Sequence, residues 1–347
     1  MFNTKKTLAL VLALVCSLML ASCGSTPEEA PAEEPETSPE ATAPVIGITW
    51  AYTDTEDPDV IAEYEGYAAV IEEAGGVPVN LAQVTTTSVG YDENGVILPE
   101  YVDENGMLLQ EYADQVKACD YASTNVEEVM DGIDGVFFIG GEDISPSLYA
   151  EPTALDNNGE EINATRDISD YTLMAYCIDN DVPTLAACRG EQMMGIVSGC
   201  TFIQDIPNYY AAQGVEGYEE VYDGGHRMAP GMENRTYARH TVDILDNSKW
   251  LGDIVGADTL ENVSSWHHQN VDSVEGTNLT VVATATLNDV TLVEGIERQD
   301  KTFCLGVQFH PENDCALALY EGDAEAALCD LDTCLNFFRT LVSYAAQ

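Results

Sequence analysis

Positive charge is the scarcest property of this sequence. Its 347 residues include 12 Lys and Arg against 61 Asp and Glu, which gives a formal net charge of −49. A surface this negative repels phosphate backbones, so nucleic acid is excluded as a partner. Aromatic residues are also few, at 8%, but 45% of all residues are apolar, so the chain can bury a core and is neither disordered nor fibrous. A solvated acidic coat is the simplest interpretation, and a specific cationic partner is the alternative.

Long apolar runs are limited to the N-terminus. Thr7–Ala21 is too short to span a membrane comfortably, follows Lys5-Lys6 and ends in Leu20-Ala21-Ser22-Cys23. This order is typical of a secretory signal peptide, and its end resembles the bacterial lipobox. We expect residues 1–22 to be removed as a lipoprotein signal peptide and Cys23 to be lipidated, with an ordinary signal peptide as the alternative. The lipid would anchor the protein to the membrane in the cell envelope, on the outer side of the cytoplasmic membrane or facing the periplasm.

Residues 24–44 differ in composition from everything that follows. They contain five prolines and six glutamates but no basic residue. Such a segment cannot pack and is extended by its own charge repulsion. We therefore expect residues 23–44 to form an acylated, disordered acidic tether and residues 45–347 to form the folded body.

The folded body alternates strand-length apolar runs with helical patterns. This alternation predicts an α/β fold with a mostly parallel central sheet flanked by helices. Continuous apolar runs, as in buried strands, cover Val45–Trp50, Val77–Leu81, Gly135–Ile139, Val182–Ala187 and Phe303–Phe309. Helical spacing covers Val60–Ala74 and most of Ala316–Ala346.

Residues 91–111 interrupt this pattern. Asn94-Gly95 and Asn105-Gly106 lie between short apolar runs and predict two hairpin-like turns. The Asp-Glu-Asn-Gly spacing does not fit a calcium-binding EF-hand loop. The segment is either a surface insertion or a lid over the functional site.

Three segments carry the chemistry. An apolar strand runs into Cys188, and a glycine and a helical pattern follow it, which predicts a strand–turn–helix elbow with the thiol at its tip. Alone, such a cysteine would more often be a buried structural residue. However, Gly140-Gly141 ends another strand and can aim backbone N–H groups at an oxyanion. His310 and Glu312 supply a base and the carboxylate that orients it.

As a set, these segments resemble class I glutamine amidotransferase-like domains, whose fold is flavodoxin-like. The similarity is closer to the peptidase C26 group and, within it, to gamma-glutamyl-gamma-aminobutyrate hydrolases. It covers about residues 45–345 and includes Gly140-Gly141-Glu142-Asp143-Ile144-Ser145-Pro146, Arg166-Asp167, Cys188-Arg189-Gly190-Glu191-Gln192, Gln204-Asp205 and His267-His268-Gln269. Ala186-Ala187 stands where the family usually has Gly-Ile, and alanine in a tight elbow predicts a strained turn.

The resemblance implies a cysteine-dependent γ-glutamyl hydrolase. Cys188 would attack the γ-carbonyl of a γ-glutamyl amide, His310 would pass the proton to the leaving amine, and Glu312 would orient the imidazole. The N–H of Arg189 and an N–H of the Gly140-Gly141 loop would hold the oxyanion, and water would release glutamate from the thioester. No cofactor and no metal are implied, and no cysteine or histidine spacing indicates zinc.

The α-amino and α-carboxylate groups of such a substrate need partners of their own. Arg166 and Arg189 are the candidates for the carboxylate, with a surface position and packing of the elbow as the respective alternatives. Gln192, His267 and His268 are also expected at the substrate, and a structural role for the histidine pair is equally open.

The remaining histidines and cysteines are expected to be unremarkable in function. His226 and His240 are interpreted as ordinary surface or core histidines. Eight cysteines follow Cys23, and an odd number is left once Cys188 is kept free as the nucleophile, so a full disulfide framework is not expected.

Two other functions stay open. A folate poly-γ-glutamate or γ-glutamyl peptide hydrolase would use the same residues. A lipoprotein that binds γ-glutamyl compounds without turnover would explain the altered elbow, although the intact Cys188, His310 and Glu312 favour an enzyme. In each case the partner is a small molecule, and the sequence leaves a homodimer open.

Overall fold

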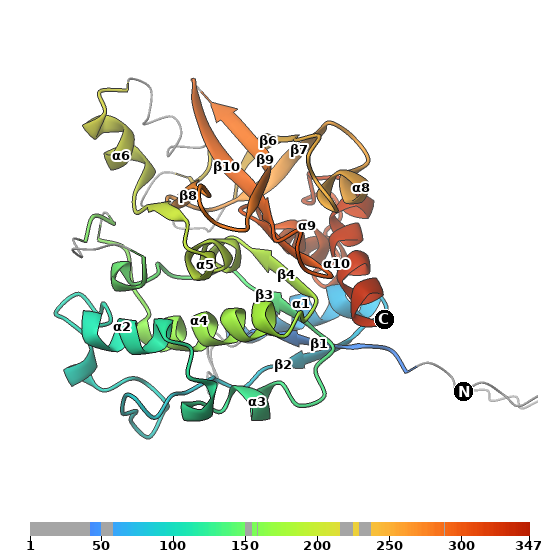
Figure 1. The fold of residues 1–347 in the computed structure, drawn as a ribbon. Helices are drawn as coiled ribbons and strands as arrows, with labels where there is room; N and C mark the ends of the chain where they lie inside the picture. The colour runs from blue at the N-terminus through green and yellow to red at the C-terminus, as the bar shows by residue number, and fades with distance from the viewer. Residues whose placement is uncertain are drawn as a thin grey trace, which may run out of the picture. The chain divides into compact units, whose positions relative to one another are not determined.

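A sheet of nine strands runs through the residues that the structure describes, in the order β2-β1-β3-β4-β11-β10-β9-β6-β7 (Figure 1). The computed structural model describes residues 42–49, 58–149, 155–157, 159–215, 225–228, 237–287 and 289–347. The expected signal peptide, Cys23 and nearly all of the expected tether lie outside these residues. None of the described helices is long and apolar enough to cross a membrane.

Five neighbouring strands of this sheet are parallel. They are β1 (Val45–Ile48), β2 (Val77–Asn80), β3 (Gly135–Phe138), β4 (Thr184–Ala187) and β11 (Cys304–Val307). Each lies within one of the five apolar runs, so the predicted parallel strands are confirmed. Their lateral order, second-first-third-fourth-fifth along the chain, is that of flavodoxin-like folds.

The rest of the sheet is antiparallel and was not predicted. It consists of β6 (Ala238–Ile244), β7 (Thr259–Ser265), β9 (Thr280–Leu287) and β10 (Val290–Glu297). A separate antiparallel pair joins β5 (Thr201–Ile203) and β8 (Asn270–Ser273). Much of β6, β7 and β9 mixes buried with exposed residues, so these segments lack the continuous apolar runs of the parallel strands.

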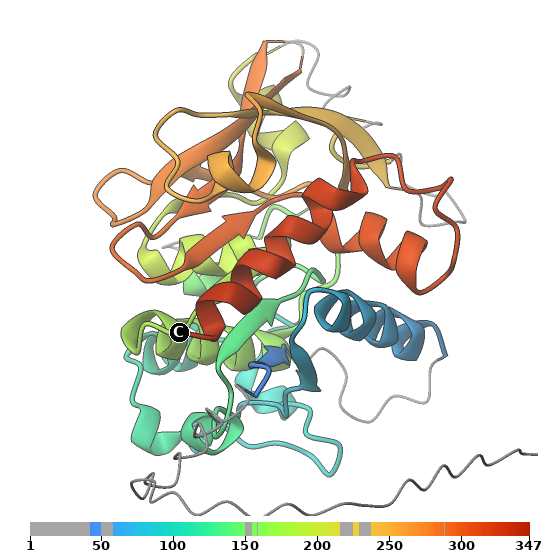
Figure 2. The ribbon, with the colours of Figure 1, turned by 90° about the vertical axis from the view of Figure 1, so that its right-hand side faces the viewer.

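Helices cover both faces of the parallel strands. On one face, α1 (Pro58–Glu73), α9 (Pro311–Leu319) and α10 (Leu331–Ala345) pack together (Figure 2). The other face carries α4 (Ala164–Asp179) and α5 (Arg189–Ser198), with α2 (Gln110–Lys117) and α3 (Val126–Val129) against α4. Shorter helices are α6 (Ile206–Ala212), α8 (Leu251–Val255) and the 3-10 turns Pro99–Tyr101, Tyr121–Ser123 and Pro146–Leu148.

Alternation along β3 shows how the two layers bury the sheet. Phe137 packs edge to face against Phe338 of α10, with ring centroids 5.1 Å apart. The next residue, Phe138, points to the opposite face and lies beneath Gly190 of α5. Both phenylalanines are almost completely buried, as expected for a central strand that is covered on both sides.

Residues 91–111 form the two expected turns. Antiparallel bridges close them between Tyr91 and Ile97 and between Val102 and Leu108. The turns pack on the body of the protein, since the Ile97 N–H donates to Thr165 Oγ1 of α4 at 3.0 Å. The segment is therefore a docked insertion.

Candidate active site

Cys188 occupies the sharp turn between β4 and α5. Its backbone has φ 51° and ψ −110°, a strained conformation for a non-glycine residue and one suited to a side chain at the tip of an elbow. The Cys188 N–H donates to Val307 O at 2.8 Å, which ties the turn to β11. The helix begins at Arg189, so its N-terminus follows the thiol directly.

Close packing at the elbow depends on Gly190. A Cβ there would lie 2.7 Å from both the Cβ and the carbonyl oxygen of Phe138, closer than real carbon atoms approach. Ala186 and Ala187, in contrast, are fully buried strand residues without positive φ. The expectation that these alanines strain the turn is therefore wrong, because the unusual backbone conformation falls on Cys188 itself.

His310 follows β11 and is oriented by Glu312. Its Nδ1 donates to Glu312 Oε1 at 2.6 Å, and its backbone N–H donates to Ser264 O at 2.8 Å. Burial disfavours the protonated imidazole, but the Glu312 carboxylate outweighs it and raises the pKa of His310 well above its usual range. The buried Nε2 has no hydrogen-bond partner among the described residues. This nitrogen is the atom that a general base would use.

Gly140 brings the thiol and the imidazole together. A Cβ at this position would lie 2.7 Å from Cε1 of His310, which would displace the imidazole, and 3.6 Å from Cβ of Cys188, an ordinary contact. Gly141 has φ 151°, and a Cβ there would lie 1.8 Å from Nη1 of Arg166. The predicted oxyanion loop is thus next to the thiol and has two glycines that cannot be replaced without movement.

The Arg189 side chain does not face the substrate. It is fully buried, forms ion pairs of 2.6 Å with Asp167 and with Asp170, and donates from Nε to Glu142 O. The prediction that its guanidinium could bind the substrate carboxylate is wrong, since every part of that group is used inside the protein. Its backbone N–H lies at the start of α5, directly after Cys188, and its role as an oxyanion donor stays a prediction.

Arg166 makes hydrogen bonds and ion pairs that hold the Gly140-Gly141 loop in place. Its Nη2 donates to Gly140 O at 2.6 Å, its Nη1 pairs with Glu142 at 3.0 Å and its Nε pairs with Asp170 at 3.1 Å. The side chain is 1% exposed, although it contributes to the cavity wall. These contacts favour a positioning role over the expected contact with a substrate carboxylate.

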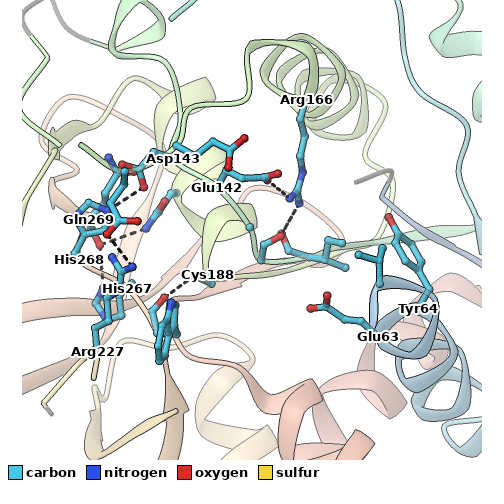
Figure 3. A pocket seen from close by; sticks show the side chains of 18 residues that line it. Glu63, Tyr64, Glu142, Asp143, Arg166, Cys188, Arg227, His267, His268 and Gln269 are labelled. Atoms are coloured by element: carbon cyan, nitrogen blue, oxygen red, sulfur yellow. Dashed lines mark hydrogen bonds and ion pairs between the residues drawn. The ribbon is translucent and has the colours of Figure 1, made fainter. Parts of the chain in front are cut away.

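A cavity of about 360 Å³ opens over the thiol. Figure 3 shows Cys188 between Glu63 and Tyr64 of α1 on one side and His267 and His268 on the other. Five carboxylates line the cavity: Glu63, Glu142, Asp143, Glu160 and Glu161. None of the described lining residues belongs to 91–111, so the insertion does not act as a lid in this structure.

The expected substrate residues Gln192, His267 and His268 all line this cavity. His268 lies between two carboxylates, with Nδ1 2.9 Å from Asp205 and Nε2 3.0 Å from Asp143. Burial lowers the pKa of His268, but these carboxylates outweigh it and raise the value to about 9. His268 is therefore a fixed cation in the cavity wall at neutral pH.

Comparison with known proteins identifies the family. The family model of Peptidase C26 matches residues 118–312. The chain belongs to the peptidase C26 family. Its fold is the class I glutamine amidotransferase-like fold, a mixed sheet that is parallel in its centre and flanked by helices.

Relatives of this peptidase C26 protein are distant. It is 35% identical to Protein NtpR of Enterococcus hirae over 184 residues, 53% of this chain and 68% of that one. It is 25% identical to gamma-glutamyl-gamma-aminobutyrate hydrolase PuuD of Escherichia coli over 211 residues, 57% of this chain and 73% of PuuD. A solved glutamine amidotransferase of Thermotoga maritima is 14% identical, with a TM-score of 0.45 over 88% of this chain and 98% of its own.

Some residues of the peptidase C26 cavity were not found from the sequence. Glu63 and Tyr64 come from α1, far along the chain from every motif. Arg227 also lines the cavity, lies over the Trp266 ring at 5.4 Å and pairs with Glu160 at 2.9 Å. No local pattern marks these residues, since only the tertiary fold brings them to the thiol. The scarcity of basic residues was the one available signal for Arg227.

Proposed function

We propose that this peptidase C26 protein hydrolyses γ-glutamyl amides through a thioester on Cys188. The observation that carries the proposal is the environment of the thiol: a strained elbow, and beside it a carboxylate-oriented imidazole whose Nε2 has no hydrogen-bond partner among the described residues. A purely structural cysteine needs neither feature. The coarser conclusion, a hydrolase or amidotransferase-like enzyme, follows from the family alone.

The reaction would have two steps, formation of a thioester on Cys188 and its hydrolysis. The Cys188 sulfur forms a bond to the γ-carbonyl carbon while His310 takes the thiol proton, and the oxygen becomes an oxyanion at the Gly140-Gly141 loop and the Arg189 N–H. Collapse breaks the C–N bond, and His310 returns the proton to the leaving amine. Water, deprotonated by His310, then attacks the thioester, and free glutamate and the thiol result.

The charged residues around the cavity affect which substrate and which leaving amine the protein would accept. Arg227 is the candidate partner for a substrate carboxylate, because it lines the cavity with 14% of its side chain exposed, whereas the side chains of Arg166 and Arg189 are almost completely buried. Its ion pair with Glu160 would be shared with or replaced by the substrate. The five lining carboxylates would favour a cationic leaving group over an anionic one such as γ-aminobutyrate. Leaving groups of both signs therefore have to be compared.

The test is release of glutamate from a panel of γ-glutamyl compounds by the purified, reduced protein. The panel contains γ-glutamyl-γ-aminobutyrate, a γ-glutamyl diamine, a γ-glutamyl peptide, a folate poly-γ-glutamate and glutamine. Cys188→Ala should abolish release, while Cys119→Ala, a half-buried thiol away from the cavity, should retain it. Loss of release in both variants, or retention in both, would refute the assigned nucleophile. Binding without release by the folded wild type would instead support the non-catalytic alternative.

A further inference from the structure

Four side chains outside the proposed reaction converge on one point beside the cavity. His226 comes from segment 225–228, His240 from β6, His267 from the residues after β7, and Glu294 from β10. The Glu294 Oε1 atom lies 3.0 Å from His226 Nδ1, 3.3 Å from His240 Nε2 and 3.5 Å from His267 Nε2. His226 Nδ1 and His267 Nε2 are 3.1 Å apart. The Glu294 Oε1 atom is thus within 3.5 Å of a nitrogen of each of three imidazoles, and ligand atoms of His226, His240 and Glu294 all lie within 4.8 Å of one another.

Hydrogen bonds to backbone carbonyl oxygens fix which ring nitrogen carries the hydrogen in two of these imidazoles. His267 Nδ1 faces Gln269 O at 2.9 Å, and His240 Nδ1 faces Gly225 O at 3.1 Å. A carbonyl oxygen only accepts, so Nδ1 carries the hydrogen in both rings. In the neutral rings each Nε2 then presents a lone pair toward Glu294. Metal-binding histidines are held in this way, with the far N–H on a carbonyl or carboxylate.

Burial makes this arrangement costly without a cation. Glu294 is 0% exposed, and neither of its oxygens, nor Nε2 of His240, has a hydrogen-bond partner among the described residues. A cation held between Glu294 and these rings would stabilise the buried carboxylate.

We propose that His226, His240, His267 and Glu294 bind one zinc ion. In a tetrahedral site with zinc–ligand bonds of about 2.0–2.1 Å, neighbouring ligand atoms lie ~3.4 Å apart. Four of the six ligand pairs, at 3.0 to 3.5 Å, are close to that edge length, and binding would draw His240 and His267 together around the ion. The sequence had led us to expect no metal, and had classed His226 and His240 as ordinary histidines.

The zinc ion would be structural. Four protein ligands complete a tetrahedral shell and leave no position for water or substrate, so no step of the proposed hydrolysis passes through the metal. Its effect would be on the cavity wall. His226 precedes Arg227, and His267 follows Trp266, whose carbonyl oxygen lies 3.8 Å from the Cys188 sulfur. The metal would hold both lining residues against the sheet.

The first measurement is the metal content of the full chain, purified without a histidine tag. We expect about one zinc per chain by elemental analysis, and tetrahedral ligand-field absorption when the protein is refolded with cobalt(II) in place of zinc. Less than about a tenth of an equivalent in the wild type, together with no spectral or thermal response to added zinc or cobalt, would overturn the proposal. This readout does not depend on turnover, so it stands apart from the test of the hydrolase.

Variants locate the site. Glu294→Gln and His240→Ala should each lose at least nine-tenths of the bound metal. His310→Ala removes another buried histidine and should keep the full equivalent while it abolishes any hydrolysis. Retention of zinc in both cluster variants would refute the assigned ligands. If a cluster variant fails to fold, the wild-type stoichiometry and the cobalt spectrum still decide the question.

Discussion

Gly190 offers a sharp test of how the elbow is packed. In Gly190→Ala the new Cβ would lie 2.7 Å from the Cβ and the carbonyl oxygen of Phe138, and 3.0 Å from its carbonyl carbon. Carbon atoms normally approach to about 3.5–4.0 Å, so the overlap is close to 1 Å. The opposing atoms belong to the backbone and Cβ of a central strand, and no rotamer change can relieve the contact. α5 and β3 must therefore separate.

The magnitude follows from two opposing effects. Overpacking of a tight interior costs about 1–3 kcal/mol, and contact with backbone atoms places Gly190→Ala at the upper end. Alanine in place of glycine within a helix contributes about 1 kcal/mol of stabilisation. The net expectation is a loss of about 2 kcal/mol in the free energy of unfolding, which lowers Tm by roughly 3 °C for a folded body of about 300 residues.

Gly252→Ala is the matched control. Gly252 also lies in a helix, α8, but a Cβ there would meet only Ser248 at 3.9 Å, an ordinary contact. This variant should be as stable as the wild type or up to about 1 kcal/mol more stable. Urea and thermal unfolding followed by circular dichroism measure both variants. A Gly190→Ala protein as stable as Gly252→Ala would refute the packing argument.

Two further predictions concern buried titratable groups. Burial, with Glu294 and Cys188 nearby, raises the pKa of Glu191 well above 4.5, so this group should lower wild-type stability by about 1.4 kcal/mol per pH unit as pH rises above that value. Glu191→Gln should remove this contribution to the slope in urea unfolding between about pH 5 and 7. An unchanged slope in the variant would contradict the prediction. His268, with its pKa raised to about 9, contributes stability that is complete below pH 6.5 and is lost as pH rises through about 9. Asp205→Asn should shrink that loss, and equal losses in variant and wild type would exclude the ion pair as its source.

The parallel half of the fold and the reacting residues could be read from the sequence. A strand that is covered on both faces must be apolar throughout, and this made β3, β4 and β11 visible as continuous runs. Cys188 and His310 follow directly on such strands, so the positions of the thiol and the base were local information. The antiparallel strands lack that signal, because much of β6, β7 and β9 mixes buried and exposed residues.

The predictions for individual side chains were wrong for a different reason. Arg189 adjoins the nucleophile in sequence, yet its helical position turns the guanidinium away from the cavity toward Asp167 and Asp170. His226, His240 and Glu294 follow no metal-binding spacing, because each comes from a separate element of the sheet or its connections. In both cases the direction of a side chain, and not the order of residues, decides the chemistry.

The residue-by-residue pairing of β4 with β11 limits which insertions and deletions this protein can accept. Ala187 is paired with Val307, and the thiol and the imidazole follow from these two strand ends. The separation of the reacting groups is thus set by the main-chain ladder. Deleting one residue within 304–309 would turn His310 toward the opposite face, whereas length changes in 91–111 leave the ladder untouched. We therefore expect the chemistry and the peripheral decoration of this scaffold to evolve independently of each other.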